Sequence, residues 1–310
     1  MQVSGILFFY TICFKGKWLM RSALIVMLLL VGILYAGYLG RDLWRHRQEL
    51  KSTTPASGWV AISGVFIFLL STLGVSDFAV STAIYSPTKW VTMKQLPGTL
   101  NVQGVLPFVM MGIGFTGVVK VAPVTLILLV GAQVVGAILS PRLVVKLPER
   151  TIKWWIACGL VVAGGFILAS RLHLIAGNGT ATELTGGKLL IGCLLQMVYG
   201  ALNNIGIGSY ALTTATVYAL GLNPLVAFPV MMSGSALSVA AGSSMFIHYG
   251  DYNRKVAAVA TSFGLLGVLL GLVVFAHFNV AIVTWIVIGV LFYTAGNLFY
   301  GLVQQRRVEK

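Results

Sequence analysis

Two short stretches of the chain carry glycine and hydroxyl residues inside otherwise apolar sequence. They are residues 73–83 (LGVSDFAVSTA) and 205–215 (IGIGSYALTTA), which align without a gap at an offset of 132 residues. Four aligned pairs are identical: Gly74/Gly206, Ala79/Ala211, Thr82/Thr214 and Ala83/Ala215. Because similar residues fill most of the other positions, the two copies predict a duplicated element with one role.

Each copy has the residues expected where a helix breaks at glycine and a new helix begins. Asp77 and Ser209 occupy equivalent positions, and both are favourable N-cap residues. Ser81 and Thr213 follow four residues later, hence one turn deeper on the same face. A helix N-terminus presents unpaired N–H groups and the positive end of the helix dipole. Two such ends aimed at one point could bind an anion without a buried lysine or arginine.

The candidate binding residues are therefore the glycines, caps, hydroxyls and amides of both copies. Glycine would let the backbone approach a ligand closely, and the two asparagines could donate amide N–H groups. Small and hydroxyl residues also serve ordinary helix packing in membranes, but the duplication favours binding. The candidates are Gly74, Ser76, Asp77, Ser81, Thr82, Asn203, Asn204, Gly206, Gly208, Ser209, Thr213 and Thr214.

Asp77 has two possible roles, which the sequence leaves open. It is the one acidic residue inside a predicted span, where a carboxylate costs about 2.5–3.5 kcal/mol. As the N-cap of a helix beginning at Phe78 it should tolerate replacement by Asn or Ser. As a proton-coupling group it should tolerate neither, because neither titrates. A charged Asp77 would repel an anion, so anion binding would favour the protonated form and link the two movements.

The composition is that of a membrane protein. The 310 residues are 58% hydrophobic and only 9% charged, with a mean hydropathy of +0.93. Successive apolar runs of about 20 residues predict an all-α polytopic protein of the cell membrane, because backbone polar groups must be paired inside the bilayer. The net charge is +14. The lysines and arginines behind it lie between the apolar runs, as in cytoplasmic loops, and this pattern does not indicate nucleic-acid binding. No metal, haem or nucleotide motif is present, so we expect no cofactor and no enzymatic activity.

The apolar runs divide the chain into an N-terminal segment, two similar halves and a tail. The predicted segments are 1–58 with a span at 22–39, a first repeat at 59–171, a linker at 172–187, a second repeat at 188–303 and a basic tail at 304–310. The first repeat has a long region at 59–86 and spans near 99–119, 121–139 and 154–170. The second has a long region at 188–219 and spans near 224–247, 255–276 and 279–303. Residues 1–19 suit a signal peptide, an interfacial segment or an over-extended start, and receive no function.

The long region 59–86 would measure about 42 Å as one straight helix, against a bilayer core of about 30 Å. If both long regions fold back as re-entrant hairpins, fifteen lysines and arginines fall on the side of Arg41 and only Lys120, Arg171 and Lys188 clearly on the other. Lys15, Lys17 and Arg21 conflict with this count. Each half then has three crossings, so the halves are inverted and the hairpin tips meet near the midplane, which is a transporter plan. Single crossings, giving parallel halves, remain the alternative.

Other polar and small residues within the spans have expected structural roles. Gln103, Gln133 and Gln196 should bridge helices through hydrogen bonds. Glycines at helix interfaces let backbones approach closely, and five are expected to do so. These are Gly131, Gly136, Gly264, Gly267 and Gly271.

With these motifs the chain resembles the TauE/SafE family of sulfite exporters and anion permeases of bacterial membranes. Gly206-Ile-Gly-Ser-Tyr210 keeps part of that family's glycine-rich turn, and Gly74-Val-Ser-Asp-Phe78 keeps its leading glycine. Residues 223–227 (NPLVA) and 144–150 (VVKLPER) resemble further family segments. The resemblance implies ion-coupled transport of a sulfur-containing or organic anion across the cytoplasmic membrane. The partners would be that anion, a coupling proton or other ion, and the bilayer. A membrane scaffold or an intramembrane enzyme are the competing hypotheses.

Overall fold

A computed structural model describes residues 2–52, 55–92, 94–143, 179–203 and 209–277, with scattered residues between 154 and 172 and between 285 and 304; side chains are described from Met20 onward. These residues are helical and contain no strand, only an isolated bridge between Ala181 and Leu222. The helices are α1 (Gln2–Arg45), α2 (Ser57–Thr72), α3 (Asp77–Thr88), α4 (Leu96–Val118), α5 (Pro123–Leu143), α7 (Gly186–Asn203), α8 (Tyr210–Ala219), α9 (Ala227–Tyr249) and α10 (Arg254–His277). Two 3₁₀ turns, η1 (Glu49–Lys51) and η3 (Pro224–Val226), complete the described elements.

Four helical segments are long and apolar enough to cross a membrane, which agrees with a membrane protein. They are Met20–Arg45, Leu96–Val118, Pro224–Tyr249 and Arg254–Ala276. The shorter segments Ser57–Thr72 and Pro123–Leu139 are also apolar. The helices predicted near 99–119, 224–247 and 255–276 are confirmed to within a few residues. In the spans expected at 154–170 and 279–303 the structure describes only scattered residues, and residues 173–178 of the linker lie outside the described residues.

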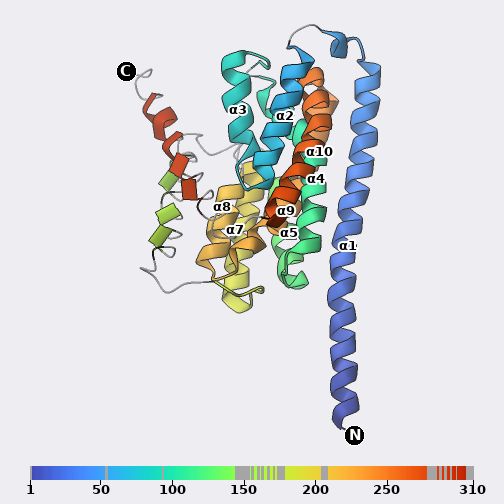
Figure 1. The fold of residues 1–310 in the computed structure, drawn as a ribbon, viewed down its shortest axis with the longest axis vertical. Coiled ribbons are helices and arrows are strands. Elements are labelled where there is room, and N and C mark those ends of the chain that lie inside the picture. The colour runs from blue at the N-terminus through green and yellow to red at the C-terminus, as the bar shows by residue number, and fades with distance from the viewer. Residues whose placement is uncertain are drawn as a thin grey trace.

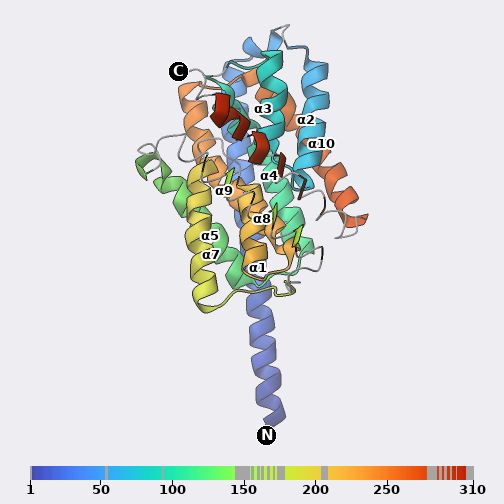
Figure 2. The ribbon, with the colours of Figure 1, turned by 90° about the vertical axis from the view of Figure 1, so that its left-hand side faces the viewer.

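The first helix is much longer than the predicted span at 22–39. α1 has 44 residues, or about 66 Å of helix, and its N-terminal part extends beyond the rest of the bundle (Figures 1 and 2). Its buried residues Leu24, Leu28, Tyr35 and Leu39 recur at helical spacing and pack towards α4 and α9. The opposite face, including Leu34, is exposed. α1 therefore contacts the bundle along one side only.

The first long region is broken at the predicted place. α2 ends at Thr72, and α3 begins at Asp77 after a turn in which Gly74 has a φ of +93°, which glycine adopts without strain. Figure 1 shows α2 and α3 side by side in one half of the bundle, at the level of the C-terminal end of α1. α7 and α8 form a similar pair in the other half, as Figure 2 shows from a second side.

Glycines allow the helices of the bundle to pack closely. α2 packs on α10, α7 on α5, and α4 on α9 at the centre. A side chain at Gly136 would overlap the backbone of Met197, and one at Gly267 would overlap the backbone of Val65. Gly264 and Gly271 also face α2, so these four predictions are confirmed. The prediction for Gly131 is wrong among the described residues, none of which has an atom within 4 Å of the place where its side chain would be.

Polar contacts join the loops at each end of the bundle. One end of the bundle contains Arg254 and is called the Arg254 end. There Lys94 pairs with Asp251 at 3.7 Å, and Asn253 donates a hydrogen bond to the carbonyl of Trp90 at 3.3 Å. At the other, the Lys120 end, the N–H of Ala122 donates to the carbonyl of Thr182 at 2.8 Å. The loops after α1, α3 and α9 thus share one end, and those after α4 and before α7 share the other.

Candidate functional site

The two sequence copies meet inside the bundle. Ser71, in the last turn of α2, donates a hydrogen bond of 3.1 Å from Oγ to the hydroxyl of Tyr210, the first residue of α8. Both side chains are buried, and the ring of Phe108 packs against Tyr210 with centroids 6.2 Å apart. The Asp77 carboxylate lies within electrostatic reach of the same hydroxyl. The two helix breaks are therefore neighbours, although 139 residues separate the bonded pair in sequence.

Asp77 is the most unusual residue of the site. It is 1% exposed, and neither carboxylate oxygen forms a hydrogen bond with a described residue. The backbone N–H groups of Asp77 and Phe78 at the start of α3 interact favourably with this carboxylate, but neither makes a hydrogen bond of normal geometry with it. A buried carboxylate without a partner is costly, which marks this position as a functional candidate.

The predicted capping role of Asp77 is wrong. α3 begins at Asp77 itself, and the carbonyl of Ser76 accepts the hydrogen bond from Val80 N–H at 3.1 Å. Ser76 therefore holds the N-cap position. Asp77 is therefore the first residue of the helix and not its cap, and its carboxylate makes no capping hydrogen bond with a described residue.

The predicted cap at Ser209 is also wrong in its side-chain chemistry. Ser209 precedes α8, but its backbone is helical (φ −80°, ψ −6°) rather than extended, and its hydroxyl makes no capping bond. Its Oγ instead accepts a hydrogen bond of 3.2 Å from Gln133 Nε2 of α5. Its own N–H donates to Asn203 Oδ1 at 2.9 Å, so the end of α7 satisfies the start of α8.

Glutamines hold the deeper hydroxyls, as predicted for Gln103, Gln133 and Gln196. Gln103 Nε2 donates to Ser81 Oγ at 2.9 Å, and Gln196 Nε2 donates to Thr213 Oγ1 at 3.2 Å. Each bond joins a short helix to a neighbouring helix. Ser81 and Thr213 therefore fix the positions of α3 and α8.

The remaining candidates differ in what the structure says of them. Thr214 donates to the carbonyl of Tyr210 in its own helix at 2.9 Å, and Thr82 is half-buried. Gly74 lies in the first turn, where its N–H donates to the carbonyl of Ser71 at 2.9 Å. The predicted residues Asn204, Gly206 and Gly208 lie outside the described residues.

Two side-chain amides that bond to Ser209 each have one buried atom without a hydrogen-bond partner among the described residues. Asn203 is 2% exposed, and its Nδ2 has no hydrogen-bond partner among the described residues. Gln133 Oε1 is likewise buried and unpartnered. With Asp77, these groups concentrate unsatisfied polar atoms around the start of α8, where a bound group could satisfy them.

Comparison with known proteins gave no match, whether the chain was scanned against protein-family models or searched against curated proteins and solved structures. The site is therefore interpreted from its own geometry. Among the described residues, no group of three or more His, Cys, Asp or Glu side chains could hold a metal ion. The site provides hydrogen-bonding groups, two helix N-termini and one carboxylate that can bind a proton.

Ser71, Tyr210 and Gln133 were not among the predicted site residues. Ser71 precedes Gly74 by three residues, as Asn203 precedes Gly206, so the aligned copies do place these two at equivalent positions. Tyr210 aligns with Phe78, which has no hydroxyl. Gln133 comes from a helix outside both copies, and its role depends on tertiary packing.

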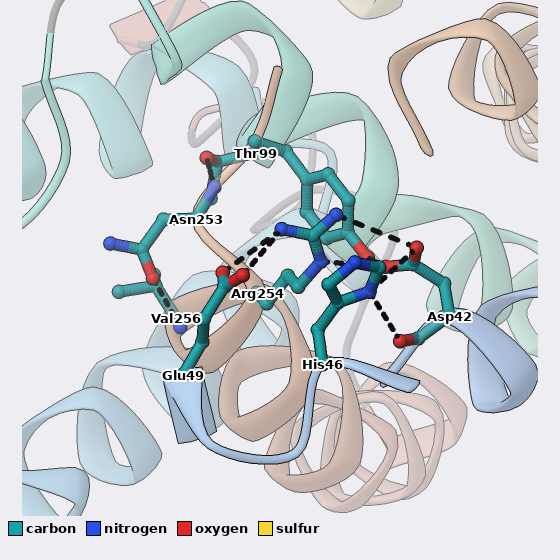
Figure 3. Close-up of polar contacts among 8 residues, drawn as sticks. Asp42, His46, Glu49, Thr99, Asn253, Arg254 and Val256 are labelled. Atoms are coloured by element: carbon teal, nitrogen blue, oxygen red, sulfur yellow. Dashed lines mark hydrogen bonds and ion pairs between the residues drawn. The ribbon is translucent and has the colours of Figure 1, made fainter. Parts of the chain in front are cut away.

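A second polar cluster lies at the Arg254 end (Figure 3). Arg254, the first residue of α10, donates from Nε to Asp42 Oδ2 at 2.8 Å and from Nη1 to both Glu49 oxygens at 2.9–3.0 Å. Tyr252 donates to Asp42 at 2.5 Å, and burial together with this carboxylate raises the pKa of the Tyr252 hydroxyl. The cluster ties the C-terminal end of α1 to the start of α10.

Proposed function

We propose that this chain is a secondary transporter of a small anion, sulfur-containing or organic, in a bacterial cytoplasmic membrane. The resemblance of its two motifs to the TauE/SafE family gives the substrate class. The proposed binding site lies between the N-termini of α3 and α8, with Asp77, Asn203 and the residues around Ser209.

The observation that carries the proposal is the hydrogen bond between Ser71 and Tyr210. It supports a site in which two broken helices direct their helix N-termini towards one buried region, where the dipoles favour an anion. A scaffold protein would not need two matched breaks in contact with each other.

In this proposal the two halves are inverted repeats. The α2–α3 pair lies towards the Arg254 end and the α7–α8 pair towards the Lys120 end (Figure 1). The packing supports the same pairing, because α2 rests on α10 of the other half and α7 on α5 of the other half. Inverted repeats with broken helices suit alternating access around a central site.

Asp77 carries the coupling proton in this proposal. Its carboxylate has no ion-pair or hydrogen-bond partner among the described residues, so a proton would remove an uncompensated buried charge. An anion bound nearby would favour the neutral form. Anion and proton would then move in the same direction.

The test is flux into proteoliposomes containing the purified full-length protein. Uptake of sulfite, a small sulfonate and a small carboxylate would be measured with and without an imposed pH gradient. We expect at least one of these anions to be driven by the gradient. Failure of all three to move, with folded protein in the membrane, would contradict the proposal.

Asp77→Asn separates coupling from binding in the same assay. We expect this variant to lose proton-driven uptake but to keep anion exchange, because the helix N-termini are unchanged. The matched control is Asp251→Asn, whose carboxylate lies on the surface beside Lys94. Full pH-driven flux through Asp77→Asn would exclude Asp77 as the proton carrier.

A further inference from the structure

The C-terminal end of α1 presents a cluster of unneutralised positive charge. Arg41 and Arg45 lie in the last turns of α1, Arg47 follows, and Lys51 ends η1. All four side chains are exposed, and none forms an ion pair or hydrogen bond with a described residue. These four residues are called the basic collar below.

The acidic residues of the same segment do not pair with the basic collar, because each is paired with a residue of another helix. Asp42 and Glu49 are both bound by Arg254 of α10 (Figure 3). The side chains of Arg254 and Asp42 are only 10% and 13% exposed. Both acids of this short segment are therefore paired with α10, although Glu49 is 52% exposed, whereas its four bases are exposed and have no such partner among the described residues.

Exposed tryptophans beside the basic collar are compatible with a position at the membrane surface. Trp44, which precedes Arg45, is 74% exposed, and Trp59 near the start of α2 at the same end is 66% exposed. Tryptophan concentrates at the level of lipid headgroups. On the adjoining part of α1, Ile33 and Leu34 are exposed aliphatic residues, as expected for a surface that faces lipid chains.

We propose that the basic collar binds the headgroups of anionic phospholipids in the leaflet at the Arg254 end. Arginine suits phosphate because its planar guanidinium can donate two parallel hydrogen bonds. Basic residues directly beyond a membrane helix attract anionic lipid, and four of them act together here. This inference concerns a surface distant from the proposed transport site, and it stands whether or not the chain transports an anion.

The test uses full-length protein in bilayer nanodiscs of equal phosphatidylglycerol and phosphatidylcholine. Native mass spectrometry would count the lipids that stay bound after release. We expect the wild-type chain to retain phosphatidylglycerol in excess, on the order of tenfold. In the combined variant Arg41→Gln, Arg45→Gln, Arg47→Gln and Lys51→Gln this excess should fall close to onefold.

Two further variants test whether lipid binding depends on the charge of the basic collar and on its position in the molecule. Arg41→Lys, Arg45→Lys and Arg47→Lys together keep the charge and should keep most of the lipid excess. Lys120→Gln with Lys188→Gln removes two lysines at the Lys120 end and should leave the excess unchanged. Full phosphatidylglycerol excess in the glutamine variant, or equal loss in the Lys120 and Lys188 variant, would overturn the proposal. Displacement of the lipid by millimolar glycerol phosphate would also overturn it, since the collar would then be a plain phosphate site.

Discussion

At the scale of single residues, the buried hydroxyls of the site are hydrogen-bonded to glutamines, whereas the buried carboxylate of Asp77 is not. Ser81, Ser209 and Thr213 each accept a hydrogen bond from a glutamine, whereas Asp77 has no such partner among the described residues. The chain thus has donors in the membrane interior but directs none of the described ones at its carboxylate. A position that costs stability in this way is expected at a functional site rather than in a structural core.

Replacing Asp77 should therefore stabilise the protein. We expect Asp77→Asn to raise the free energy of unfolding by roughly 1–2 kcal/mol, because it removes an uncompensated buried charge at similar volume. Asp251→Asn, at the surface, should change it by less than about 0.5 kcal/mol. Denaturant unfolding in detergent micelles would measure both. A clear loss of stability in Asp77→Asn would mean that the carboxylate has a structural partner.

The hydrogen bond between Ser71 and Tyr210, which joins the two helix breaks, should make a small but measurable contribution to the free energy of unfolding. Tyr210→Phe removes the acceptor for Ser71 and should lower the free energy of unfolding by about 0.5–1 kcal/mol, as typical for one hydrogen bond inside a membrane protein. Tyr218→Phe is the matched control, since Tyr218 is a buried tyrosine of the same helix whose hydroxyl has no described partner. Equal effects of the two variants would show that the Ser71 bond contributes nothing.

At the scale of helices, close packing depends on which glycine faces a neighbour. Gly136 and Gly131 lie on the same helix, α5, less than two turns apart. Of the two, Gly136 touches a backbone, that of Met197 in α7, while Gly131 has no described residue within 4 Å of its missing side chain. α5 and α7 come from different halves of the chain, so this contact helps to hold the halves together.

Replacement by alanine, which adds one methyl group, should affect stability differently at these two positions. Gly136→Ala should destabilise the protein by about 1–3 kcal/mol, because the backbones of α5 and α7 would have to move apart. Gly131→Ala should be neutral or slightly stabilising, because alanine favours the helix and meets no neighbour. Thermal unfolding of the purified variants would compare them, and equal transition temperatures would contradict the packing described here.

At the scale of the whole molecule, the loops at each end define its topology. Lys94 contacts the α9–α10 loop, and Lys255 donates to the carbonyls of Ser52 and Pro55 after α1. Lys120 follows α4 at the opposite end, near the segment that precedes α7. Because basic residues concentrate at the Arg254 end, we predict that this end faces the cytoplasm.

Labelling can test this arrangement. In a background lacking Cys13, Cys158 and Cys193, a cysteine at Lys51 and one at Lys94 should react with an impermeant reagent from the same, cytoplasmic, side. A cysteine at Lys120 should react from the opposite side. The segment 144–153, which lies outside the described residues, is expected to label like Lys94. Reaction of the Lys51 and Lys94 positions from opposite sides would exclude a re-entrant α2–α3 pair.

The sequence alone determined the features that depend on local composition. Apolar runs separated by basic loops identify membrane helices, because the bilayer selects for length and hydropathy. Glycine beside polar residues located the break after Thr72, since Gly74 can take a positive φ. Glutamines inside apolar runs indicated bridging, because a buried amide needs a partner.

Only the tertiary structure decided which partner each of these groups finds. The sequence could not pair Ser71 with Tyr210 or Gln133 with Ser209, because each pair joins helices far apart in the chain. It could not distinguish Gly131 from Gly136, since the rotation of α5 against α7 determines which glycine meets a backbone. It assigned caps to Asp77 and Ser209 from residue preference, whereas backbone conformation and the competing donor Gln133 decided otherwise. Hydropathy and local preference belong to a short stretch of chain, but hydrogen-bond partners and close contacts depend on how distant helices are placed and rotated.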